Sequence, residues 1–252
     1  TATFDIGPDG HLRYRLDLAG LPAVEPSPVG LLVDGRDLGA EVVHLDAAPA
    51  TVVDRTYATR GRSSLLRDLH AATTLTVRRA DPVDPTARLE VRVFDEGLAF
   101  RHVVPGAGTR TVTGESTAFT LPEGTEVWIN ADTGNYESEL QVLPAGGFGD
   151  DLGPPVTASL AGTGYVSVSE ADVRNWSGMT IRGDLGSRRL AAAFEDDGAW
   201  PAPAGAHSPW RLIQTARDLD GLAGGELVSH LAPDPDPALF PQGPYTPWIR
   251  RG

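Results

Sequence analysis

The stretch RLEVRVFDEGLAFRHVVP, residues 88–105, decides the fold class. Every second residue of its first half is apolar, and the same alternation returns after Asp95-Glu96-Gly97. Side chains two positions apart on a strand lie on the same face, and acidic residues followed by glycine favour a tight turn. The stretch therefore predicts an antiparallel hairpin with one face in a core. His102 falls in the inward-facing row, which indicates a core histidine rather than a ligand.

Similar alternating runs recur along the whole chain. The first is a predicted hairpin over residues 1–20 with its turn at Gly7–Gly10, and more than a dozen short strands come after it. Residues 63–71 and 220–231 are weak helix candidates, the second weakened by two adjacent glycines. We expect an all-β protein of stacked antiparallel sheets with less than about 15% helix.

No internal repeat and no linker divides the chain, so residues 1–252 are predicted to form a single domain. The proline-rich stretch near the end reads as a connector. No run of about 18 apolar residues is present, so no membrane span is expected. No signal-peptide pattern precedes the first strand, as in a processed chain.

Charge and composition exclude several partners and chemistries. The net charge is −13 and no basic run occurs, which argues against nucleic acid and against an anionic membrane surface. All 21 cationic residues are arginine, so Schiff-base lysine chemistry is absent. The chain has no cysteine, which excludes disulfides, thiolate zinc sites and cysteine nucleophiles.

The sequence contains no complete catalytic set. No H-E-x-x-H, G-x-S-x-G or strand-linked G-x-G-x-x-G pattern occurs, and the adjacent acid pairs at 95–96 and 196–197 lie beside glycines, as turn residues do. The histidines are scattered, at positions 11, 44, 70, 102, 207 and 230. We therefore assign no catalytic and no cofactor-binding residue.

One carboxylate stands out in YVSVSEADVRNW, residues 165–176. Glu170 is in phase with the two buried-type valines of that strand, where an unpaired carboxylate would cost several kcal/mol, about 3 or more. Glu170 could lie past the strand end in water, pair with Arg174 or Arg182, or face a cation. The residues alone do not choose among these.

Aromatic residues could form a platform on which a sugar ring stacks, or could belong to the core. The candidates are Trp128, Tyr136, Trp176, Trp200, Trp210 and Trp248.

Taken in order, several segments resemble the N-terminal domain of glycoside hydrolase family 97, over nearly the whole chain. They are FDIGPDGHLRYRL, LEVRVFDEGLAFRHVVP, GESTAFTLPEG, Trp128 with Tyr136-Glu137, YVSVSEADVRNWSGM, SPWR and TPWIRRG.

The resemblance implies a β-supersandwich similar to galactose mutarotase, with a catalytic TIM barrel after it in the full enzyme. Residues 233–252 would be the connector toward that barrel. The domain itself would be inactive, would pack on the barrel, and would help shape a pocket for an oligo- or polysaccharide. The parent protein would be a secreted or periplasmic bacterial enzyme of the α-glucosidase or α-galactosidase type.

The resemblance also assigns Glu170. It matches a family glutamate that binds Ca²⁺ beside the active site of the full-length enzyme, although Trp176-Ser177 stands where Tyr-Pro is common. Glu170 is therefore expected at the rim of a sheet, as one ligand of a calcium site completed elsewhere. Because the site would be incomplete in this chain, Glu170→Gln is expected to change its stability little.

Two alternatives come from other functional classes. A free-standing carbohydrate-binding module would need an exposed row of aromatic rings. An aldose epimerase on the same scaffold would need His102, His207 and His230 to converge with a glutamate in one cleft.

Overall fold

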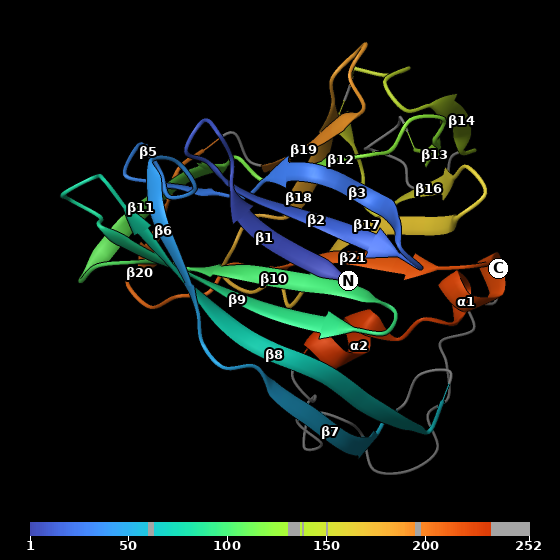
Figure 1. Ribbon diagram of the computed structural model, residues 1–252, viewed down its shortest axis with the longest axis horizontal. Helices are drawn as coiled ribbons and strands as arrows, with labels where there is room; N and C mark the ends of the chain where they lie inside the picture. The colour runs from blue at the N-terminus through green and yellow to red at the C-terminus, as the bar shows by residue number, and fades with distance from the viewer. Residues whose placement is uncertain (60–62, 131–136, 138, 150, 195–197, 233–252) are drawn as a thin grey trace, which may run out of the picture.

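The computed structural model describes residues 1–59, 63–130, 137, 139–149, 151–194 and 198–232. Strands make up 58% of the described residues and helices 5% (Figure 1). Every strand pair is antiparallel, and no barrel is present in this part of the chain. The predicted all-β class and low helix content are confirmed. The predicted connector, 233–252, lies outside the described residues.

The described residues form three sheets. The seven-stranded sheet has the order β1 (Ala2–Ile6), β2 (Leu12–Leu18), β3 (Leu21–Pro28), β12 (Ala118–Thr120), β19 (Arg189–Phe194), β18 (Met179–Gly183) and β15 (Asp151–Leu152). The ten-stranded sheet has the order β14 (Gln141–Pro144), β13 (Glu126–Ile129), β16 (Val156–Leu160), β17 (Gly164–Ala171), β21 (Trp210–Ala216), β10 (Gly97–Val103), β9 (Thr86–Phe94), β8 (Leu65–Arg79) and β6 (Val42–Ala47), with β7 (Thr51–Ala58) also on β8. The four-stranded sheet has the order β20 (Trp200–Pro203), β11 (Thr109–Glu115), β4 (Leu31–Val33) and β5 (Arg36–Asp37).

The hairpin predicted for residues 88–105 is β9–β10, paired in continuous register from Gly97 opposite Phe94 to Val103 opposite Arg88. Glycine is required at its turn because a Cβ on Gly97 would overlap the carbonyl oxygen of Ile213. The predicted first hairpin is also present, as β1 and β2.

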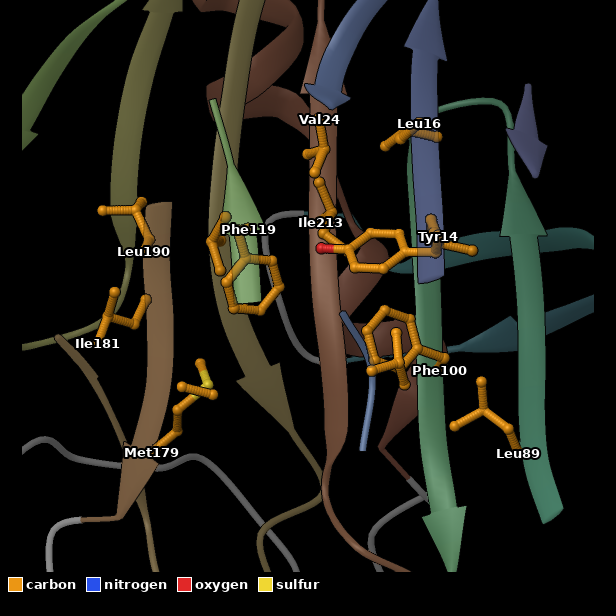
Figure 2. Close-up of a cluster of buried hydrophobic side chains, with 14 of the residues drawn as sticks. Tyr14, Leu16, Val24, Leu89, Phe100, Phe119, Met179, Ile181, Leu190 and Ile213 are labelled. Carbon is orange, nitrogen blue, oxygen red and sulfur yellow. The ribbon is translucent and has the colours of Figure 1, made fainter. Parts of the chain in front are cut away.

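The main core lies between the seven-stranded and ten-stranded sheets (Figure 2). Tyr14 of β2 packs edge-on against Phe100 of β10, with ring centroids 5.1 Å apart. The Tyr14 hydroxyl donates a hydrogen bond to the carbonyl of Ala118, so its buried polar end is satisfied. The inward side chains of β2 therefore pack against the inward row of residues 88–105.

One expected helix is wrong. Residues 63–71 fall in the long strand β8, where Leu66, Asp68 and His70 are buried on one face. Leucines three and four apart satisfied the helical pattern, but pairing with β7 and β9 on either side gives β8 a full set of backbone partners. The other candidate is helical but broken, into α1 (Leu219–Gly224) and α2 (Leu227–Leu231), at its paired glycines.

The α2 helix covers part of the outer face of the ten-stranded sheet. Leu227 and Leu231 form a second apolar cluster there with Trp210, Leu212 and neighbouring residues. None of the described helices has the length or apolar run that crossing a bilayer requires.

Charged side chains bind β7 to β8. Arg55 donates to buried Asp68 at 2.8 Å, and Arg67 makes a two-point contact with Asp54 at 2.8 and 2.7 Å. Arg55 and Asp68 are directly opposite each other, and Asp54 and Arg67 are diagonal neighbours across the two strands; opposite charges at both positions favour this pairing register.

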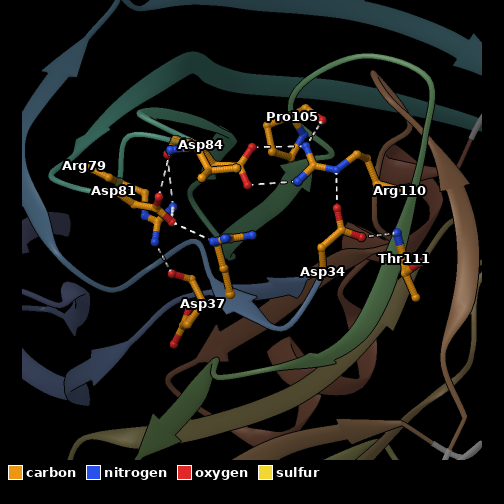
Figure 3. Close-up of polar contacts among 10 residues, drawn as sticks. Asp34, Asp37, Arg79, Asp81, Asp84, Pro105, Arg110 and Thr111 are labelled. Carbon is orange, nitrogen blue, oxygen red and sulfur yellow. Dashed lines mark hydrogen bonds and ion pairs between the residues drawn. The ribbon is translucent and has the colours of Figure 1, made fainter.

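Arg110 joins the four-stranded sheet to two turns (Figure 3). Its guanidinium donates to both oxygens of Asp84, at 3.0 and 2.8 Å, and to Asp34. Asp34 also accepts the backbone N–H of Thr111, and these bonds, that from Arg110 first, hold the pKa of Asp34 below its usual value. The network is structural, because each acid is already paired.

Candidate functional site

Glu170 points inward, as its phase predicts, but it is paired rather than solvated. Oε2 accepts a hydrogen bond from Nη1 of Arg211 at 2.7 Å, and Oε1 accepts the backbone N–H of Met179 at 2.8 Å. Glu170 and Arg211 are direct cross-strand partners in β17 and β21. The side chain of Glu170 is 12% exposed.

A second glutamate holds the other side of Arg211. Nε and Nη2 of Arg211 donate to Glu115 at 2.9 and 2.5 Å, and the side chains of both residues are fully buried. Glu115 belongs to the four-stranded sheet, Arg211 and Glu170 to the ten-stranded sheet, and Met179 to the seven-stranded sheet. All three sheets therefore meet at this group, which we call the Arg211 cluster (Glu115, Glu170, Met179, Arg211).

The charges of the Arg211 cluster stabilise one another. Burial raises the pKa of Glu115. The charge and hydrogen bonds of Arg211 together lower it by more, so the net pKa lies below the usual value. Burial lowers the pKa of Arg211, while Glu115 and then Glu170 raise it to a net value above normal. Burial also lowers the pKa of nearby His102, which keeps that ring neutral near pH 7. The group carries two carboxylates and one guanidinium.

The pairing expected for Glu170 occurs, but with a different arginine. Arg174 contacts Asp172 at 2.9 Å, and Arg182 contacts Asp151 at 2.7 Å. Neither of the two arginines considered as examples is therefore the partner of Glu170. Sequence proximity suggested them, whereas Arg211 lies 41 residues further along the chain.

The described residues do not form a calcium site on their own. Both oxygens of Glu170 already accept hydrogen bonds, and one donor is a buried cation, which would repel a bound Ca²⁺. Calcium requires six to eight oxygen ligands, about three times what one glutamate supplies. No cluster of three or more His, Asp or Glu side chains suited to a metal occurs in the described part of the chain.

The three histidines that an epimerase would require lie in different surroundings. His102 is buried on the core side of β10. His207 contacts Glu90 at 3.2 Å, and His230, on α2, contacts the hydroxyl of Tyr57 at 3.0 Å. Among the described residues they do not form a common cleft.

The aromatic residues are distributed rather than arranged in a row. Trp210 is buried, Trp128 lies near Tyr165 at 6.3 Å between centroids, and Trp176 packs edge-on against Trp200 at 5.3 Å. Tyr136 and Trp248 lie outside the described residues. A continuous sugar platform is therefore absent from the described surface.

A small pocket opens beside Trp176 and Trp200. Its volume is about 360 Å³, and Asn175 and Ser177 contribute polar groups to its lining. The indole N–H groups of both tryptophans are buried without an acceptor among the described residues. One of the two segments that line this pocket, residues 175–177, follows shortly after Glu170 in the chain.

A second hollow lies on the outer face of the ten-stranded sheet. It has a volume of about 420 Å³ and is lined by Thr74, Glu90, Arg92, Arg101 and Trp210, together with the connection before β7. The guanidinium carbons of Arg92 and Arg101 lie 4.5 and 4.3 Å from the centre of the Trp210 ring. We call this hollow the Arg92 groove.

The family model described as Glycosyl-hydrolase 97 N-terminal matches residues 1–233. The chain belongs to this family. The family 97 N-terminal domain described here is 27% identical, over 96% of its length, to a Streptomyces bingchenggensis protein named "Probable retaining alpha-galactosidase". It covers 37% of that protein.

Solved structures share the fold. A glycoside hydrolase family 97 enzyme from Pseudoalteromonas sp. strain K8, in complex with acarbose, superposes with a TM-score of 0.83 at 17% identity, over 94% of this chain and 37% of the enzyme. A β-arabinopyranosidase superposes with a TM-score of 0.76 at 21% identity, over 88% of this chain and 39% of its own. The family 97 N-terminal domain thus spans under two fifths of the length of these relatives.

The family and the inward direction of Glu170 were evident from the sequence, but Arg211 and Glu115 were missed. The sequence did contain a signal at Arg211, which is a charged residue between Trp210 and Leu212, but none at Glu115, whose neighbours are polar or glycine. The sequence does not show that β17 pairs with β21 or that β11 approaches these strands, so it does not indicate that the three charges meet.

The Arg211 cluster predicts that its members affect stability unequally. Arg211→Met would leave two buried carboxylates unpaired and should cost about 3–5 kcal/mol. Glu170→Gln keeps the size of the side chain but loses the charge and replaces one of two acceptor oxygens by a donor that faces an N–H group, and should cost about 1–2 kcal/mol. From the sequence we expected almost no effect of Glu170→Gln, because the calcium site would be incomplete in this chain and no metal binding would be linked to its folding. Urea unfolding would measure both, with exposed Glu126→Gln as the control that should change nothing; equal stabilities of all variants would contradict the prediction.

Acid should weaken the same cluster. The pKa of Glu115 is lower in the folded protein than in the unfolded chain, where it is about 4.3. Ionised Glu115 therefore stabilises the fold at any pH above about 4.3, and this stabilisation is lost as the pH falls through the folded-state pKa. The wild-type chain should therefore lose more unfolding free energy between pH 6 and pH 3 than Glu115→Gln does. Denaturant titrations at several pH values would test this, and parallel pH profiles would show that Glu115 does not contribute.

Proposed function

We propose that this chain is the non-catalytic N-terminal domain of a longer glycoside hydrolase. The observation that carries the proposal is the family match over residues 1–233, combined with coverage of only 37% of the related proteins. In this proposal the catalytic carboxylates belong to a TIM barrel elsewhere in the longer polypeptide. The domain packs on that barrel and helps shape the pocket for an oligo- or polysaccharide.

The substrate class is inferred from the named relatives. One carries the name of an α-galactosidase, another was solved with acarbose, and a third is named as a β-arabinopyranosidase. A pyranoside, and an α-galactoside first, is the substrate class that these names favour. We further propose a secreted or periplasmic location for the enzyme.

The two alternative functions have less support. The dispersed aromatic residues provide no row for a free-standing carbohydrate-binding module on the described surface. The separate surroundings of His102, His207 and His230 provide no epimerase cleft among the described residues. Titration with sugars and polarimetry of mutarotation would detect either activity directly.

The 252-residue chain should not hydrolyse nitrophenyl α-galactoside or α-glucoside, because it lacks a barrel with catalytic carboxylates. The longer polypeptide that contains it should hydrolyse one of them. Both proteins would be assayed side by side against a buffer blank. Activity of the short chain that survives repurification would overturn the proposal, and so would an inactive longer polypeptide.

Calcium is proposed for the longer polypeptide only, on the match of Glu170 to the family pattern. Millimolar calcium chloride should leave the melting temperature of the 252-residue chain unchanged relative to EDTA, for wild type and Glu170→Gln alike, because no metal binding is linked to its folding. In the longer polypeptide, Glu170→Gln should weaken calcium affinity and lower activity, and excess calcium should partly restore that activity. A calcium-dependent rise in the melting temperature of the short chain, or an unaltered calcium dependence of the longer variant, would contradict these expectations.

A further inference from the structure

The Arg92 groove contains a charge without a direct counter-ion among the described residues. Arg92 is partly buried against Trp210, and Nη1 makes a close polar contact with the backbone carbonyl of His230, at 3.4 Å. No carboxylate of the described residues forms an ion pair with it. Burial first, and then the neighbouring Arg101 charge, lower the pKa of Arg92. A partly desolvated guanidinium in this position favours an approaching anion.

Arg101, on the neighbouring strand β10, has carboxylate partners of the kind that Arg92 lacks among the described residues. It stacks on the same Trp210 ring, yet it contacts Glu90 at 2.7 Å and Asp172 at 3.7 Å. Glu90 also contacts His207 at 3.2 Å, so its oxygens are shared between two partners. The acids around the groove are therefore engaged by groups other than Arg92.

The groove is large enough for a side chain to enter. Its volume is about 420 Å³, and its walls combine the two arginines and Trp210 with small residues such as Ala72 and Thr74. A carboxylate entering it would find the Arg92 donors on one side and an aromatic surface behind them. Two-point pairing of guanidinium with carboxylate is the arrangement that this geometry suits.

The last described element lies beside the groove. The His230 carbonyl that Arg92 contacts belongs to α2, which ends at Leu231. The segment that follows α2 in the chain therefore starts close to Arg92. A tethered group acts at an effective concentration of roughly millimolar, whereas a free anion must approach a domain whose net charge is −13.

We propose that the Arg92 groove is a docking site for an aspartate or glutamate side chain of the catalytic domain, whose carboxylate pairs with Arg92. This inference rests on the proposed function, because the occupant belongs to the longer polypeptide. It identifies the outer face of the ten-stranded sheet beside α2 as an interface between the domains.

Arginine footprinting tests the proposal directly. Phenylglyoxal modification, with peptide mass spectrometry as the readout, would be compared between the 252-residue chain and the longer polypeptide. Arg92 should react in the short chain and about tenfold more slowly in the longer one, where a buried pair would cover it. Arg88 is the matched control, because it lies on the same face of β9, is exposed, and should react equally in both proteins. Equal reactivity of Arg92 in both proteins, or protection in both, would overturn the proposal.

A pair of variants provides a second measurement. Arg92→Gln should lower the melting temperature of the longer polypeptide by about 4 °C or more relative to Arg88→Gln, because it leaves a partner carboxylate unpaired at the interface. In the 252-residue chain the difference between the two variants should be smaller, because Arg92→Gln there loses only the stacking on Trp210 and the contact with the His230 carbonyl. A difference of the same size in both proteins would assign Arg92 a role within this domain and overturn the docking site.

Hydrolase activity of the same longer preparation separates the two proposals. An active enzyme with unprotected Arg92 would overturn the docking site and leave the proposed function standing. An inactive polypeptide with protected Arg92 would overturn the proposed function and support the docking contact.

Discussion

The buried guanidinium of Arg211 is the contact on which the architecture depends. It pairs with Glu170 on the neighbouring strand and with Glu115 on another sheet, and Glu170 reaches a third sheet through the Met179 backbone. Apolar packing between stacked sheets is largely non-directional and allows sheets to slide. A planar group with fixed donors tolerates little displacement, so the Arg211 cluster specifies how the three sheets meet.

The same preference for arginine recurs across the domain. Arg110 joins a sheet to two turns, Arg55 binds buried Asp68, and all 21 cations of the chain are of this type. Arginine donates in several directions from one plane, which suits junctions where segments far apart in sequence converge. An acidic chain that relies on such junctions should lose them together as its carboxylates are protonated.

Local pattern was sufficient for the parts of the fold that depend on neighbours in sequence. The alternation in residues 88–105 predicted β9 and β10, and the phase of Val166 and Val168 correctly placed Glu170 inward. It failed where partners are remote: residues 63–71 resembled a helix although β7 and β9 enclose them, and Arg211 was not among the arginines considered for Glu170. Glu115 lies 96 residues from Arg211, and no local pattern connects the two. The Arg92 groove escaped notice for the same reason, since its residues come from several strands.

The ion pairs between β7 and β8 have a consequence for self-association. In the described part of the chain β7 pairs only with β8, so one side of its backbone is open to another strand. Val52 on this strand is 75% exposed, and an exposed apolar side chain on an unprotected edge strand favours association with another molecule. Asp54 and Arg55 place opposite charges on the two faces of the same strand, and a second molecule adding its own strand there would have to desolvate both. This edge should therefore resist the strand-by-strand growth that leads to fibrils.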